Sequence, residues 1–181
     1  MFQVAKRVSF DDPPTLCQLA EHHAVVKEAI CLYYYSPENP GIRQPFASDT
    51  RAEIRASRDV RLQEASAASA LTLLAAIEAS FRVDYLQRNY FKKRDDLSRA
   101  FRALYKEKGE RVSLSKDILQ AWLDHFDVAP TLVGDIRAAL KYRHWLAHGR
   151  YWDPKLGRQY DFETIYNLGC RIESAFPFLP S

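Results

Sequence analysis

The stretch that decides the fold is ASAASALTLLAAIEASF, residues Ala65 to Phe81, in which every helical face is apolar or small. From Asp49 or Thr50 the chain runs beyond Phe91 without a glycine or proline. A helix through this stretch therefore meets no strong stop, although its length would allow a kink or a break. Because a helix that is apolar all round is normally buried, the stretch predicts the central helix of a bundle.

The composition favours helices in the rest of the chain. The 181 residues are 47% hydrophobic and 27% charged, with only 6 glycines, which describes a globular chain with one core. We expect a single all-α domain over residues 1–181. It would be an antiparallel helical bundle with a long central helix and a short hairpin or loop after the helix that runs from Thr131 to His148.

Location and cofactors are inferred from what the chain contains. Its three cysteines are far apart and lack metal-ligand spacing, which suits a reducing cytosol. Met1 to Pro14 has no apolar run, and the window nearest to a membrane span, Ala65 to Ser80, contains Glu78. We therefore expect a cytoplasmic protein without a signal peptide or membrane contact. Since no Gly-rich phosphate loop is present, we expect no nucleotide cofactor.

The most informative short segment is Arg143-His144-Trp145-Leu146-Ala147-His148-Gly149. On a helical wheel, Arg143 falls near the centre of an apolar stripe, and His144 and His148 lie one turn apart at its edge. Arg143 and His148 diverge by about 140°. They can meet at one target if the helix unwinds near Gly149, if the arginine curls round, or if two copies of the helix face each other across a two-fold axis.

This segment resembles the Arg-polar-X-X-X-His motif of the HEPN superfamily (higher eukaryotes and prokaryotes nucleotide-binding domains). The resemblance implies a helical bundle that dimerises, and a metal-independent endoribonuclease site in the dimer cleft, often in toxins or antiviral defence systems. It assigns catalytic roles to Arg143, His148 and His144. Some toxin members have a tyrosine two residues after the histidine. Here that place is Arg150, followed by Tyr151.

The chemistry of these side chains agrees with that assignment. In RNA the 2′-hydroxyl can attack the adjacent phosphodiester, which requires a base, an acid and positive charge on the phosphate. Histidine serves as base or acid near neutral pH, and arginine binds phosphate oxygens with two donors. In a symmetric dimer, one His148 would be the base and its mate the acid. His144 would bind the phosphate, fix the tautomer of His148, or act only as a polar spacer.

Glu78 is the only charged residue of the central apolar stretch. A lone buried carboxylate and a lone buried guanidinium can satisfy each other, so one hypothesis is that Glu78 holds Arg143. The other is that Glu78 pairs with Arg82 one turn along the same helix. The sequence leaves these two alternatives open.

Further candidates lie in the basic segment from Arg82 to Arg111, where aromatic residues are interleaved with cations that include Arg88. Such a segment is either a solvated face or a surface for RNA. The RNA-binding candidates are Arg150, Tyr151, Lys92, Lys93 and Arg94. We expect no metal, because Trp145 stands where a catalytic-zinc helix has glutamate. We expect the adjacent pair His22-His23 on the surface.

Two other interpretations compete with the enzyme. One is a non-catalytic helical module that uses the same cleft to bind a nucleotide or a protein. The other gives the motif a structural role, with Arg143 paired to Glu78 and His148 capping carbonyl groups beside Gly149. The expected partners are RNA, a second copy of the chain and an antitoxin or other regulatory protein.

Overall fold

The computed structural model describes residues 14–35, 46, 48–150 and 152–180. In these ranges the chain is all-helical, without a strand, and its helices pack against one another as predicted. The six α-helices are α1 (Leu16–Tyr35), α2 (Arg51–Tyr90), α3 (Asp96–Lys108), α4 (Leu119–His125), α5 (Pro130–Ala147) and α6 (Phe162–Ala175). Two short helical turns, η2 (Gly109–Arg111) and η3 (Leu114–Ile118), connect α3 to α4.

Helix α2 is the central element and runs unbroken for 40 residues, about 60 Å at 1.5 Å per residue. It begins with a capping box, in which the Thr50 hydroxyl accepts from the Glu53 backbone N–H and the Glu53 carboxylate accepts from the Thr50 N–H. These two bonds satisfy backbone donors that a helix start leaves free. The start expected at Asp49 or Thr50 agrees with this cap at Thr50, and the break that the length allowed does not occur, because the helix is continuous from Arg51 to Tyr90.

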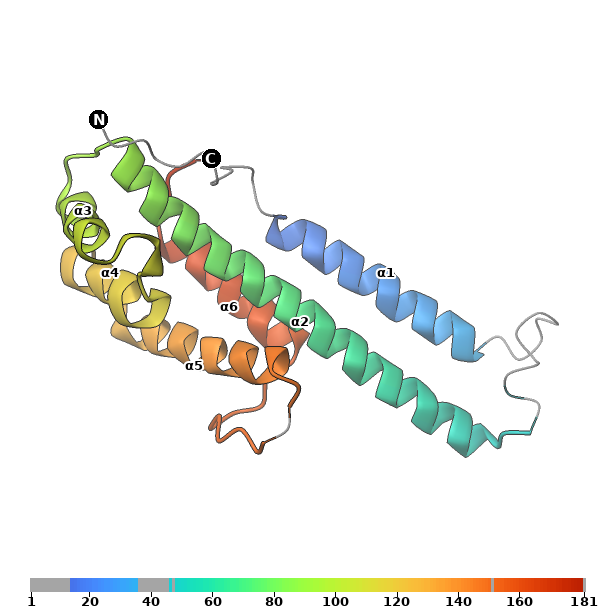
Figure 1. Cartoon of the computed structure of the whole chain (residues 1–181). Helices are drawn as coiled ribbons and strands as arrows, with labels where there is room; N and C mark the ends of the chain where they lie inside the picture. Colours follow the sequence, from blue (N-terminus) through green and yellow to red (C-terminus); the bar gives the residue numbers. More distant parts are fainter. Residues whose placement is uncertain (1–13, 36–45, 47, 151, 181) are drawn as a thin grey trace.

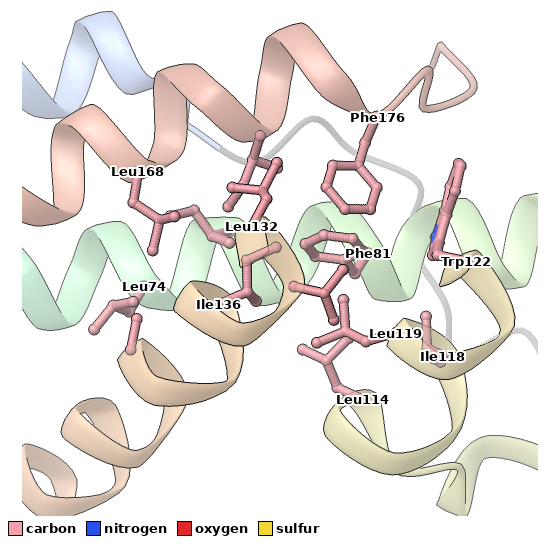
Figure 2. Packing of buried hydrophobic residues seen from close by; sticks show 14 of the residues in the cluster. Leu74, Phe81, Leu114, Ile118, Leu119, Trp122, Leu132, Ile136, Leu168 and Phe176 are labelled. Carbon is pink, nitrogen blue, oxygen red and sulfur yellow. The ribbon is translucent and has the colours of Figure 1, made fainter. Parts of the chain in front are cut away.

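Helix α1 packs along one side of α2, whereas α5 and α6 pack on another side. The first half of α2 and the second half of α1 extend past the ends of α5 and α6 (Figure 1). Figure 2 shows the core, where side chains of α2, α4, α5 and α6 meet. Leu74 and Phe81 of α2 contribute to it and are almost fully buried.

The central stretch is buried on one face only. Its core face carries Leu73 and Ile77, but Ala68, Thr72 and Ala75 are exposed on the opposite face. The expectation of burial all round was therefore wrong for that face. An 18-residue window of α2 reaches a mean hydropathy of 1.3, which makes it the only helix in the described residues long and apolar enough to span a membrane. The core helix of a globular bundle passes the same test.

The chain end after α6 is fixed against α2. The Asp84 carboxylate of α2 accepts from the Leu179 backbone N–H at 2.9 Å, and Arg88 donates to the Pro177 carbonyl at 3.0 Å. Arg88 also forms a buried ion pair with Asp84 at 2.8 Å. Burial raises the pKa of Asp84, although Arg88 and the Leu179 N–H oppose that rise. Arg88 was expected on the basic surface, and this was wrong because Asp84 neutralises it inside the core.

One histidine was also misplaced by sequence reasoning. His22 is exposed, but His23 is buried. The His23 ring stacks on Phe162 at 3.9 Å between centroids, and its Nδ1 atom lies 3.0 Å from the Ser69 hydroxyl. The two residues point apart as expected, so α2 and α6 cover one and leave the other in solvent.

Candidate functional site

Helix α5 presents the motif. It begins with Pro130 at its first turn, where the missing N–H of proline leaves no bond unmade. Leu132 and Ile136 anchor it in the core. The His148 backbone N–H still donates to the His144 carbonyl at 3.1 Å, so the helical bonding continues up to His148. The chain then turns away at Gly149, whose φ is +84°, a conformation that glycine adopts without strain.

His144 and His148 form an exposed ring pair at the end of α5. Their ring centroids are 4.2 Å apart and the planes are inclined by 52°. Both residues are exposed, so a ligand in solvent can reach either ring. The predicted placement of the two residues, one turn apart on the helix, is confirmed, although their rings are tilted rather than stacked.

Arg143 lies on a different side of α5, next to α2. Its Nε atom is 3.2 Å from Glu78 Oε2, and the Nε of Arg82 is 2.8 Å from the other oxygen, Oε1. Glu78 therefore binds both of its predicted partners at once. Arg82 makes a hydrogen bond, whereas the buried Arg143 Nε–H makes none with the described residues. The Arg143 contact is thus an attraction between charges at close range.

The exposure of this cluster corrects the helical-wheel placement. The Arg143 side chain is 37% exposed and the Glu78 side chain 18%. Arg143 therefore lies at the boundary of the core rather than at its centre. The Glu78 carboxylate lies against the Nε atom of Arg143. The rest of the guanidinium group stays partly open to solvent near the end of α5.

The predicted RNA-binding residues do not gather at the motif. Arg150 is held by Glu64 of α2 through two hydrogen bonds of 2.9 and 2.8 Å, and Tyr151 lies outside the described residues. Residues Lys92, Lys93 and Arg94 are exposed in the α2–α3 connection, at the far end of the bundle from the loop that follows α5 (Figure 1). Along α2, that connection begins about 18 Å beyond the level of Glu78.

The segment between α5 and α6 is a loop in its described residues, rather than a hairpin. It is tied to the bundle at several points. The Trp145 indole N–H donates to the Trp152 carbonyl at 2.7 Å, and Arg158 binds Asp135 of α5 at 2.6 Å. Tyr160 is buried and stacks on Tyr142 at 5.0 Å. The Trp145 contact holds Trp152 close to the side of α5 that carries His144, whereas Asp135 and Tyr142 hold the rest of the loop on the opposite side of that helix.

A groove that the sequence analysis did not foresee lies between this loop and α5. Its volume is about 420 Å³. Its walls combine cationic, aromatic and apolar residues, namely Ser115, Arg137, Leu140, Lys141, His144, Trp145, Trp152, Pro154, Lys155 and Leu156. His144 joins the groove to the motif, because its ring also lies 6.0 Å from the ring of Trp152.

The sequence contained a signal for one wall of this groove. Arg137, Lys141, His144 and His148 follow at spacings of four, three and four residues, which places them on one helical face. Only His144 and His148 were predicted to lie together, at the edge of the apolar stripe. The continuation of their face through Lys141 and Arg137 was missed.

Neither a metal-binding cluster nor a similar protein gives a further indication of function. No group of three or more His, Cys, Asp or Glu side chains suited to a metal ion occurs in the part of the chain that the structure describes. Comparisons with protein-family models, with curated proteins and with solved structures give no match.

Proposed function

We propose that the chain is a metal-independent endoribonuclease whose site is built from Arg143, His144 and His148. The observation that carries the proposal is the exposed His144–His148 ring pair at the end of α5, on the same helix as an arginine that is paired with Glu78. The resemblance of this segment to the HEPN motif supports the same assignment. A role in toxin action, stress or antiviral defence would follow from that resemblance alone.

The proposed reaction needs no group beyond the protein and RNA. The 2′-oxygen attacks the neighbouring phosphorus while a histidine removes the 2′-hydroxyl proton. The bond from phosphorus to the 5′-oxygen breaks, and a second histidine protonates that oxygen. The products are a 2′,3′-cyclic phosphate and a 5′-hydroxyl. Arg143 neutralises the charge that develops on the phosphate oxygens, and His144 binds the phosphate or orients His148.

A second copy of the chain completes this site. Arg143 lies next to α2, whereas the His148 ring lies against the exposed ring of His144. Because α5 stays regular up to Ala147, the unwinding considered for the motif does not bring the two side chains together. Two copies related by a two-fold axis place two His148 rings and two guanidinium groups around one phosphate. The proposed assembly is therefore a homodimer.

The test is cleavage of total RNA in the presence of a chelator, with the product ends typed. We expect the wild type to leave cyclic phosphate ends and His148→Ala to be at least about a hundredfold slower, since general acid–base groups contribute that much or more. His125→Ala is the matched control, because His125 is also exposed at a helix end and should not matter. Equal cleavage by the wild type and His148→Ala would refute the assignment.

The structural interpretation is the second candidate, and the Arg143–Glu78 contact favours it. In that case Arg143 and His148 only stabilise the bundle, the chain cuts no RNA, and His148→Ala lowers the free energy of unfolding through lost capping. The non-catalytic module that binds a nucleotide or a protein is a separate alternative, which would also cut no RNA. Because His148 is exposed, the ribonuclease proposal expects that substitution to change the free energy of unfolding by less than about 0.5 kcal/mol.

A further inference from the structure

The groove beside α5 has the chemical character of a nucleic-acid site. Arg137, Lys141 and Lys155 provide three cations among its lining residues, and no carboxylate belongs to that lining in the described part of the chain. Asp153, an acidic residue of the loop, is exposed and is not among the residues that line the groove. A surface of this kind attracts phosphate groups.

The cations are arranged for contact with a ligand rather than with each other. The guanidinium group of Arg137 is fixed by the Ser115 carbonyl at 3.1 Å and by Gln120 at 3.0 Å. Both of these partners are neutral, so neither of them offsets the positive charge of Arg137. Lys141 and Lys155 are exposed on opposite walls, one on α5 and one in the loop.

The floor of the groove suits an unpaired base. Leu140 and Leu156 give it apolar surface, and the indoles of Trp145 and Trp152 line it. The Trp145 indole is bonded through its N–H to the Trp152 carbonyl and stacks on Tyr142, so it contributes apolar surface rather than a donor. Bases of single strands stack on such rings, whereas the bases of a duplex are already stacked and paired.

The geometry points to this groove as the binding site for a single-stranded segment of RNA. Its phosphates contact Lys141, Lys155 and Arg137, and a base lies against Trp152. The basic face of α5 continues from Arg137 to His148 over about 16 Å, so the bound strand runs past His144 to the reactive histidine. The link to cleavage rests on the proposed function, but the binding itself does not.

Binding is tested with the wild-type protein and a short 2′-O-methyl oligoribonucleotide of mixed sequence, followed by fluorescence anisotropy. This probe keeps the phosphates and bases but has no free 2′-hydroxyl to attack. We expect Lys141→Glu/Lys155→Glu to weaken binding at least tenfold. It should also reduce the slope of log binding constant against log salt concentration by about two, because two phosphate contacts are lost. Lys27→Glu/Arg55→Glu is the matched control, with the same change of charge at two exposed residues of α1 and α2, and its binding should stay within about twofold of the wild type.

A second variant separates stacking from charge. Trp152→Ala should lower the affinity for the single-stranded probe about tenfold. The weak affinity for a duplex of the same sequence should stay unchanged. Equal binding of single strand and duplex by the wild type would overturn the inference. The inference would also be overturned if Lys141→Glu/Lys155→Glu bound the single-stranded probe as tightly as the control variant does.

The two proposals fail separately. If the wild type binds the probe through Lys141 and Lys155 but cuts no RNA, the groove stands and the ribonuclease assignment falls. If RNA is cut at His148 and the groove double variant binds and cuts like the wild type, the ribonuclease stands and the groove inference falls.

Discussion

Glu78 is the residue whose removal tests the candidate site most directly. Its carboxylate lies 3.2 Å from Arg143 Nε and 2.8 Å from Arg82 Nε. At 3.2 Å and an effective dielectric constant of about 20, the Coulomb attraction to Arg143 is about 5 kcal/mol before desolvation and screening. Because the Arg143 side chain is 37% exposed and the Arg82 side chain 40%, most of this attraction is offset by solvent.

We therefore expect a coupling energy of about 1 kcal/mol between Glu78 and Arg143, and of about 0.5 kcal/mol between Glu78 and Arg82. Glu78→Gln removes both attractions and leaves two neighbouring arginines without an anion. It should lower the free energy of unfolding by about 2 kcal/mol, which for a chain of this size lowers Tm by about 4 to 8 °C.

The assay is a double-mutant cycle in urea at neutral pH, with Glu78→Gln and Arg143→Met alone and together. Glu64→Gln is the matched control, since Glu64 lies on the same helix as Glu78 and pairs with Arg150 after α5, and both of these side chains are well exposed. We expect the control to change stability by less than about 0.5 kcal/mol. A Glu78–Arg143 coupling below about 0.3 kcal/mol would refute the claim that this carboxylate fixes the arginine.

Two other perturbations probe the scaffold around the site. Arg88→Ala leaves Asp84 buried without its cation and frees the Pro177 carbonyl, so it should lower the free energy of unfolding by about 3 to 5 kcal/mol; a loss below about 1 kcal/mol in urea unfolding would contradict this. Burial lowers the pKa of His23, so folding favours its neutral form. This contribution to stability is complete above about pH 6.5 and is lost as pH falls through the lower folded pKa. His23→Phe should therefore flatten the decrease of Tm between pH 7 and pH 5, and an unchanged profile would refute that role.

Local interactions explain why much of the fold could be predicted. The absence of glycine and proline after Thr50 predicted α2, which the capping box then begins, and Pro130 and Gly149 lie at the two ends of the motif helix. The 3.6-residue period placed His144 over His148. Each of these features depends on residues within about one helical turn, so the linear order of residues is sufficient to find it.

The errors concern faces rather than helices. Arg88 and His23 are buried because Asp84, Ser69 and Phe162 meet them. Ala68 is exposed because no helix covers that side of α2 in the described residues. Whether a face is covered depends on how distant segments dock, and a helical period does not contain that information.

The sequence by itself therefore determined an all-helical chain, a long central helix and the order of Arg143, His144 and His148 along α5. Only the tertiary structure decided that Glu78 serves Arg143 and Arg82 together, and that the loop carrying Trp152 and Lys155 closes a groove beside His144. Helices form from contacts between near neighbours in the chain. A carboxylate shared by two helices, or a groove between a helix and a loop, depends instead on the relative position at which those elements pack.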